Sequence, residues 1–162
     1  MRLKAMAKIN LGLDVLGKRE DGYHEVRMIM QTIRMYDILD IRKTRRPGIV
    51  LTTNLPFIPT DQRNLVYKAA QMLMEEFDVS IQLDKHIPVA AGMAGGSSDA
   101  AAAFVGVNRM FHLGLTEEQL MERAVKVGAD VPYCIMRGTA LAEGIGEKLT
   151  RLPEVPKCYV LI

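Results

Sequence analysis

The segment with the clearest chemical potential is PVAAGMAGGSSDAAAAF, residues 88–104. Three glycines fall within positions 92–96, immediately before an alanine run that favours a helix. Glycine inside an element costs about 0.5–1 kcal/mol relative to alanine, so this clustering needs a compensating role. The first backbone N–H groups of a helix lack intrahelical partners and lie at its positive end, and neighbouring glycines let phosphate oxygens reach them. The segment therefore predicts an anion-binding loop.

The same segment has a purely structural alternative. Ser97 or Ser98 could cap a helix after an ordinary surface turn, with the alanines packed against a sheet. That arrangement needs one glycine at most. The segment also lacks the Lys-Ser or Lys-Thr of a Walker A loop and the GxGxxG spacing of a dinucleotide fold. Phosphate binding and a simple turn both stay open on this segment alone.

Lys8 and Asn10 are the next candidates, two residues apart in the extended stretch AMAKINLGLDV at 5–15. Successive side chains of a strand alternate between faces, so these two lie on the same face. A lysine among apolar neighbours either extends its ammonium to solvent or places a fixed positive charge inside a site. A lone lysine favours the first interpretation.

Asp130 lies in the apolar stretch VGADVPYC, residues 127–134. A buried lone carboxylate is costly, so this residue must be paired, must cap a helix or must be functional, and a helix cap is the default. Tyr23 and His24 follow a turn at residues 21–22. An aromatic ring beside an imidazole can stack on a planar ligand and hydrogen-bond to it, although a turn with a packed tyrosine explains the pair equally well.

Taken together, these groups are the parts that a phosphoryl transferase needs. The glycine segment can hold ATP phosphates, a lysine can balance developing charge, and a carboxylate can accept a hydroxyl proton. The aromatic and imidazole pair can recognise the acceptor. Each part is weak alone, and their coexistence in one chain of 162 residues favours this chemistry.

The elements that must position these residues follow from hydrophobic periodicity. Alternating or continuous apolar runs predict strands. They cover residues 3–9, 11–16, 26–33, 36–41, 49–53, 79–83, 139–142 and 148–152. Strands come first and helices later, without regular alternation, which favours an α+β fold over a doubly wound sheet.

Three helices are predicted from apolar residues at helical spacing. The first can be capped by Asp61 and buries Val66, Ala69, Ala70, Leu73 and Phe77. The second follows the glycine segment, ends at Gly114 and buries Ala100, Phe104, Val107 and Phe111. The third opens with a capping box of Thr116 and Gln119, ends at Gly128 and buries Leu120, Ala124 and Val127.

Bulk composition narrows the class of protein. The chain is long enough for one ordinary domain, and 49% hydrophobic with 25% charged residues is typical of a soluble globular protein. A net charge of +2 implies neither nucleic acid nor a membrane surface as a partner. Cys134 and Cys158 lack metal-ligand spacing, and we find no signal peptide and no apolar run that could span a membrane. We therefore expect a cytoplasmic protein with reduced thiols.

Four stretches occur in order along the chain: AKIN at 7–10, DGYH at 21–24, PVAAGMAGGSSDAA at 88–101 and GADVP at 128–132. Together they resemble the GHMP kinases, the family of galacto-, homoserine, mevalonate and phosphomevalonate kinases. Within the family, the match is to the members that phosphorylate 4-diphosphocytidyl-2-C-methyl-D-erythritol in the non-mevalonate route to isoprenoids. The resemblance implies a ribosomal protein S5 domain 2-like fold, with a mostly antiparallel sheet and helices on one side.

The resemblance also implies a role for each candidate residue. Asp130 would take the proton of the acceptor's 2-hydroxyl, and Lys8 would orient that carboxylate and stabilise negative charge. Asn10 would contact the methylerythritol part, while Tyr23 stacks on the cytosine and His24 hydrogen-bonds to it. ATP and Mg²⁺ are the implied cofactors, and the metal ligands stay unknown. The N–H groups of 95–98 would be the main donors to the ATP phosphates. The resemblance places these residues around the phosphates: Pro88, Val89, Ala90, Ala91, Gly92, Met93, Ala94, Gly95, Gly96, Ser97 and Ser98.

The chain departs from the family pattern in two ways. Met93 and Ala94 stand where the family often has Leu and Gly, which should still allow the loop to fold. Family members also carry a second domain after the point where this chain stops. We therefore expect an N-terminal ATP-binding domain over residues 1–155, with 156–162 as the start of a C-terminal domain or a final strand. The oligomeric state is not predicted.

Three other functions stay open. The chain could be a non-catalytic module that only binds nucleotide, or another small-molecule kinase of the family. The sequence DGYH at 21–24 disfavours the second, because it suits a cytidine better than a small acid. An S5-like fold can also serve RNA, but the small net charge disfavours that function.

Overall fold

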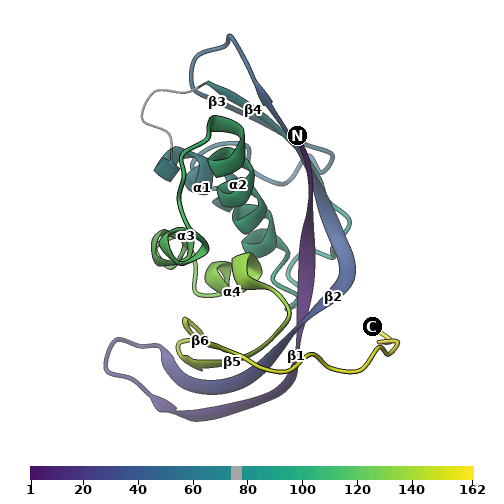
Figure 1. The fold of residues 1–162 in the computed structure, drawn as a ribbon, viewed down its shortest axis with the longest axis vertical. Coiled ribbons are helices and arrows are strands. Elements are labelled where there is room, and N and C mark those ends of the chain that lie inside the picture. The colour runs from purple at the N-terminus through teal and green to yellow at the C-terminus, as the bar shows by residue number, and fades with distance from the viewer. Residues whose placement is uncertain (74–77) are drawn as a thin grey trace.

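A computed structural model describes residues 1–73 and 78–162. Six strands form one sheet, and the helices lie on one side of it (Figure 1). The main strand order is β3-β4-β2-β5-β6, and β1 pairs with β2. Four of the five pairings are antiparallel, and only β3 and β4 run parallel. The predicted α+β class with a mostly antiparallel sheet is confirmed.

Two long strands, β1 (Arg2–Lys18) and β2 (His24–Lys43), form an antiparallel hairpin that bends along the whole molecule (Figure 1). The sequence predicted four shorter strands here. The breaks between them are irregularities within continuous strands, because the register of β1 against β2 shifts at three places. Such bulges bend a strand and re-aim its side chains. One of them directly precedes Lys8.

The second edge of β2 is shared by two strands. β4 (Val79–Asp84) pairs with residues 38–43 of β2, and β5 (Thr139–Gly144) pairs with residues 26–31. The outer strands are β3 (Ile49–Thr53), beside β4, and β6 (Lys148–Arg151), beside β5. Between its pairings with β4 and β5, this edge of β2 has no strand partner among the described residues. The segment that follows β4 and the segment that precedes β5 contact β2 there.

The described residues form four helices. They are α1 (Leu65–Leu73), α2 (Gly95–Phe111), α3 (Glu117–Ala124) and α4 (Val131–Met136). Of these, α1, α2 and α4 pack against the sheet, and α3 packs on α4 and α2. The central helix α2 packs closely because four consecutive alanines, Ala100 to Ala103, are buried. At Gly106 an added Cβ would lie 2.4 Å from Ile41 Cδ1, so a side chain here would force buried residues of β2 to shift.

The predicted caps are partly corrected. Thr116 and Gln119 do form the capping box of α3, but Val127 lies beyond the end of that helix. The first helix is capped by Asn64, whose Oδ1 accepts from Val66 N at 2.9 Å, while Asp61 instead pairs with Arg63. Phe77 lies outside the described residues. Helix α4 was not predicted, because six residues that are all buried show no amphipathic stripe.

Residues 156–162 were expected to be the start of a C-terminal domain or a final strand. Among the described residues no strand follows Arg151, so the alternative of a final strand is wrong for this stretch. An apolar run forms a strand only where it pairs with a neighbouring edge, and residues 156–162 take part in none of the sheet's pairings. Among the described residues, no helix has the length and apolar character that a membrane crossing requires.

Candidate active site

A cavity of 470 Å³ opens at the N-terminus of α2. Its wall combines the segment before α1, the end of β4, the glycine segment and the residue that precedes α4. The lining residues are Ile58, Pro59, Arg63, Asn64, Leu65, Leu83, Lys85, Pro88, Val89, Ala90, Ala91, Gly92, Met93, Ala94, Gly95, Gly96, Ser97, Asp99 and Asp130. Ten of the eleven residues predicted around the ATP phosphates therefore line one cavity.

Lys8 and Asp130 meet at this cavity. The Lys8 ammonium lies 3.5 Å from Asp130 Oδ2 and donates to Asn10 Oδ1 at 3.1 Å. Only 5% of Lys8 is exposed, so the interpretation that it extends to solvent is wrong. The predicted common face of Lys8 and Asn10 is confirmed. Because a buried ammonium requires partners, the pair fixes a positive charge beside a carboxylate.

Asp130 occupies the N-cap position of α4, yet its side chain makes no capping hydrogen bond. The default interpretation as a structural cap is therefore wrong for the carboxylate, which faces Lys8 instead. Tyr133, one turn later, anchors α4: its hydroxyl donates to Gly138 O at 2.7 Å and lies 3.0 Å from Thr32 Oγ1. Burial raises the pKa of Tyr133 to about 12, so the hydroxyl keeps its proton.

Two alanines of the glycine segment adopt backbone conformations that glycine usually provides. Ala90 and Ala94 have φ values of 60° and 54°, in the left-handed region that glycine prefers. Gly95 lies in the first turn of α2, where an added Cβ would be 3.1 Å from the Lys85 ammonium nitrogen. The main chain of β1 also holds the segment, since Lys8 N donates to Met93 O at 3.1 Å. The loop is thus positioned by the strand that carries Lys8.

The helix begins three residues earlier than a cap at Ser97 would place it, and four earlier than a cap at Ser98. Its N-cap is Ala94, without a side-chain cap, so neither Ser97 nor Ser98 caps α2. Ser98 is also the one predicted ATP-site residue that does not line the cavity. Its N–H donates to Ala94 O at 2.8 Å and its hydroxyl to Gly95 O at 2.9 Å, which corrects the prediction for Ser98. The helix donors left for an anion are those of residues 95–97.

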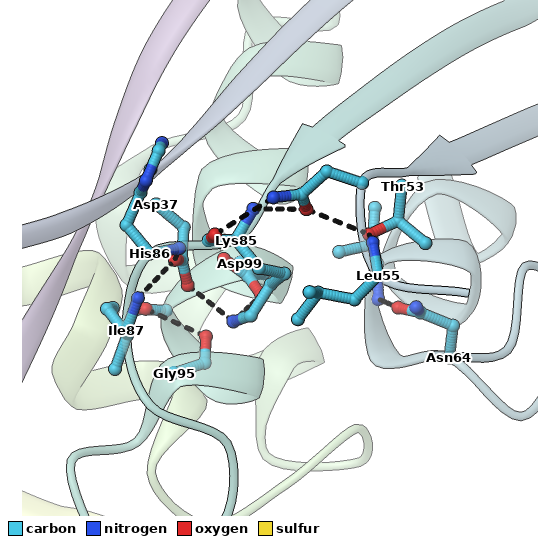
Figure 2. A network of polar contacts seen from close by, with 12 residues as sticks. Asp37, Thr53, Leu55, Asn64, Lys85, His86, Ile87, Gly95 and Asp99 are labelled. Carbon is cyan, nitrogen blue, oxygen red and sulfur yellow. Dashed lines mark hydrogen bonds and ion pairs between the residues drawn. The ribbon is translucent and has the colours of Figure 1, made fainter. Parts of the chain in front are cut away.

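A buried ionic cluster forms the floor of the cavity, and the sequence did not predict it (Figure 2). Lys85 donates to Asp99 Oδ2 at 2.7 Å and also to Asp37 Oδ2. Asp37 Oδ1 accepts from two backbone groups, the N–H of His86 and the N–H of Ile87. The cluster therefore joins β2, the end of β4 and the first turns of α2. We name Lys85, Asp37 and Asp99 the floor cluster.

The protonation of the floor cluster is set by burial and by its own charges. Burial raises the pKa of Asp99 from 3.8 to about 8; the Lys85 ammonium opposes this rise and Asp37 adds to it. Burial disfavours the charged form of Lys85, but the two carboxylates outweigh this effect and raise its pKa. Lys85 therefore stays protonated, whereas Asp99 is a poor acid.

The structure does not bring Tyr23 and His24 to the cavity. Both lie at the tip of the β1–β2 hairpin, where His24 pairs with Lys18 and 59% of Tyr23 is exposed. The tip is held by Tyr23 N donating to Asp21 Oδ1 at 3.1 Å. Their predicted contacts with a cytosine stay predictions.

The turn between β5 and β6 is a further neighbour of the Lys8–Asp130 pair that the sequence did not predict. A Cβ built on Gly146 would lie 3.9 Å from Asp130 Oδ1. This residue has a φ of +113°, which a side chain would strain. The turn therefore brings bare backbone close to the carboxylate.

A magnesium ion has no ready set of protein ligands here. Within residues 1–73 and 78–162, no three His, Cys, Asp or Glu side chains are grouped so that they could hold a metal. Asp130 is already paired with Lys8. Magnesium is often held by substrate phosphates with one or two carboxylates, so any ion here would depend mainly on the phosphates.

Comparison with known proteins gives one consistent family. The model of the GHMP kinases N terminal domain matches residues 64–138. The 4-diphosphocytidyl-2-C-methyl-D-erythritol kinase of Lachnospira eligens is 56% identical across 100% of this chain. That of Lachnoclostridium phytofermentans is 58% identical across 99%. The chain spans 58% and 56% of the length of these two curated relatives.

Solved structures agree with the sequence relatives. The crystal structure of a 4-(cytidine 5'-diphospho)-2C-methyl-D-erythritol kinase matches with a TM-score of 0.79 and 35% identity, over 94% of this chain and 55% of that chain. Methanococcus jannaschii mevalonate kinase matches with a TM-score of 0.71 at 14% identity, over 94% of this chain and 56% of that chain. The second likeness supports the fold alone.

Proposed function

Because this chain belongs to the GHMP kinase family, we propose that it transfers the γ-phosphoryl group of ATP to the 2-hydroxyl of 4-diphosphocytidyl-2-C-methyl-D-erythritol. The observation that carries this proposal is the Lys8–Asp130 pair, 3.5 Å apart, at the cavity formed by the glycine segment. The two curated relatives named above carry the same activity in their names. The residues needed for a phosphoryl donor and for proton transfer thus meet in one place.

The phosphate donor is bound by the main chain at the start of α2. The N–H groups of Gly95, Gly96 and Ser97 have no intrahelical acceptor, and they lie at the positive end of a helix of 17 residues. This arrangement suits the oxygens of a triphosphate. The apolar wall formed by Pro59 and Leu65 suits the uncharged part of the nucleotide.

The acceptor reacts beside Asp130. Asp130 Oδ2 takes the proton of the 2-hydroxyl as that oxygen bonds to the γ-phosphorus, and the bond from this phosphorus to the β,γ-bridging oxygen breaks, releasing ADP. The fixed charge of Lys8 orients the carboxylate and stabilises the negative charge of the transferring group. Such a positioned base contributes about 10²–10⁴-fold, and alignment and charge neutralisation supply the rest.

The remaining assignments complete the acceptor side of the proposal. Asn10, bonded to Lys8, contacts the methylerythritol part. Tyr23 and His24 recognise the cytosine from the hairpin tip. Mg²⁺ accompanies ATP and is held mainly by its phosphates. We propose that residues 1–155 form the ATP-binding domain and that the reaction takes place in the cytoplasm, where ATP is available.

The test is phosphoryl transfer followed by phosphorus NMR, with ATP, magnesium and 4-diphosphocytidyl-2-C-methyl-D-erythritol. The parent chain should form product, and Asp130→Asn should form none while it keeps its affinity for ATP. Normal turnover by Asp130→Asn would overturn the role of this carboxylate. ATP binding without product in the parent would instead favour the alternative of a nucleotide-binding module, because the chain spans little more than half of its relatives.

A further inference from the structure

The floor cluster holds three ionisable side chains in a nearly water-free position. Asp37, Asp99 and Lys85 are 0%, 2% and 8% exposed. Lys85 and Asp99 line the cavity proposed for the triphosphate. A single cation therefore faces two carboxylates directly below the phosphate-binding loop. If both carboxylates were ionised, the cluster would carry a net negative charge toward a polyanion, which would oppose binding.

The two carboxylates differ sharply in their hydrogen bonds. Asp37 accepts from Lys85 and from two backbone N–H groups, at His86 and Ile87. Asp99 accepts at Oδ2 from Lys85 alone. Its Oδ1 is buried and has no hydrogen-bond partner within the described residues. Donors stabilise the ionised form of a carboxylate, so the poorly solvated Asp99 is the member that takes up a proton.

The other charged groups around the cavity do not change this assignment. Arg63, from the segment before α1, lies 2.7 Å from Asp61. Lys8 of β1 pairs with Asp130, which precedes α4. His86, after β4, meets Asp37 through its backbone N–H. Arg63 and Lys8 therefore each have a carboxylate of their own, and His86 meets Asp37 rather than Asp99, so among the described residues Lys85 is the cation that contacts Asp99.

We propose that Asp99 is a positioning residue that holds a proton at Oδ1, so that the floor cluster carries no net charge beneath the triphosphate. The neutral cluster keeps Lys85 hydrogen-bonded to both carboxyl groups. It thereby holds the first turn of α2, where Gly95 lies against the ammonium, in place for phosphate binding. This inference rests on the proposed function, because it takes the cavity as the triphosphate site.

The proton itself can be observed without any nucleotide. Carbon NMR of the chain labelled at its aspartate carboxyl carbons, compared with Asp99→Asn to assign the signal, reports the ionisation of Asp99. The expected signal is that of a protonated carboxyl at pH 7, with a titration midpoint near 8. A midpoint near the ordinary value of 3.8 would overturn the proposal. This outcome does not depend on whether the chain is a kinase.

The consequence for binding is tested by ATP titration calorimetry between pH 7.5 and 9.5. The parent should lose about tenfold in affinity as Asp99 ionises, because a new negative charge appears near the phosphates. Asp99→Asn, which stays neutral, should bind equally well across this range. Asp61→Asn is the matched control: it removes an exposed carboxylate at the rim and should keep the parent's dependence on pH. The same slope in parent and Asp99→Asn would contradict the inference.

A purely structural role for Asp99 would give a different pattern. It would lower ATP affinity in Asp99→Asn at every pH or leave the affinity unchanged, without altering the slope. If the parent binds no ATP at any pH, the proposed function fails, and the NMR titration still decides whether Asp99 holds a proton. The two hypotheses are therefore separated by two independent measurements.

Discussion

Replacing Asp99 by asparagine should stabilise the fold, by an amount that grows with pH. An aspartate in the unfolded chain has a pKa of 3.8, whereas that of Asp99 in the fold is about 8. Between these values the folded chain binds one more proton than the unfolded chain. Its free energy of unfolding therefore falls by about 1.4 kcal/mol for each pH unit. This contribution is intact below pH 3.8 and is lost progressively up to pH 8.

The magnitude follows from this slope. From pH 4 to pH 7 the parent loses about 4 kcal/mol through Asp99, and Asp99→Asn loses none of it. The asparagine amide adds one buried donor without a partner, at a cost of about 1 kcal/mol. We therefore expect Asp99→Asn to be about 3 kcal/mol more stable than the parent at pH 7, and about equal or slightly less stable at pH 4.

The assay is urea denaturation followed by circular dichroism at each pH unit from 4 to 8. Asp61→Asn is again the control: its exposed carboxylate has a pKa lowered to about 2 by Arg63, so it stays ionised across the whole range. Its difference from the parent should be constant above about pH 5, where this carboxylate is ionised in the folded and in the unfolded chain. If the difference between Asp99→Asn and the parent is also constant, Asp99 ionises as an ordinary aspartate, and the reasoning about the floor cluster is refuted.

Three further changes probe the geometry of the site. Lys8→Met should reduce kcat by about 10²–10³-fold with little change in the Kd for ATP, and an unchanged kcat would exclude its electrostatic role. Tyr133→Phe should lower the free energy of unfolding by about 1–3 kcal/mol, measured by urea denaturation, because Gly138 O loses its buried donor. Gly95→Ala should weaken ATP binding in calorimetry, since its Cβ would lie 3.1 Å from Lys85 Nζ. Gly96→Ala is the control, because the nearest neighbour of its Cβ would be at 3.6 Å and the variant should fold normally. Equal losses of ATP affinity in the two variants would contradict the close approach at Gly95.

Hydrophobic periodicity predicted most of the sheet and the three amphipathic helices, because each of those elements has one buried face. It could not predict α4, whose six residues are all buried and therefore show no contrast along the sequence. It also chose Asp61 over Asn64 as the cap of α1. Both residue types cap helices, and only the fold shows which one meets the free N–H of Val66.

The Lys8–Asp130 pair shows a different limit. Lys8 and Asp130 each favoured a structural interpretation when taken alone. Their coexistence with the glycine segment suggested shared chemistry, and the family resemblance gave each residue its expected role. The structure brings them to 3.5 Å because a bulge re-aims β1 and α4 begins at Asp130. Neither the bulge nor the short helix leaves a clear signal in the sequence.

One residue of the floor cluster could have been recognised from the periodicity of the sequence. Asp37 has the same parity as Leu39 and Ile41 in β2, and all three are buried on one face. A carboxylate on a core face must have a partner. The sequence did not show which residue is that partner, because Lys85 lies 48 residues further along the chain.

The two lysines hold the C-terminal part of the glycine segment, where it enters α2, and this helps the segment to keep an alanine at a left-handed position there. The main chain of Lys8 binds Met93 near the loop's end, and the ammonium of Lys85 lies against Gly95 at the first turn of α2. Each lysine is in turn fixed by carboxylates, at Asp130 and in the floor cluster. Strain at Ala90 and Ala94 persists only where such surroundings over-determine the backbone. The N–H groups at the start of α2 and the Asp130 carboxylate are thus fixed relative to each other, which is the preorganisation that the proposed phosphoryl transfer requires.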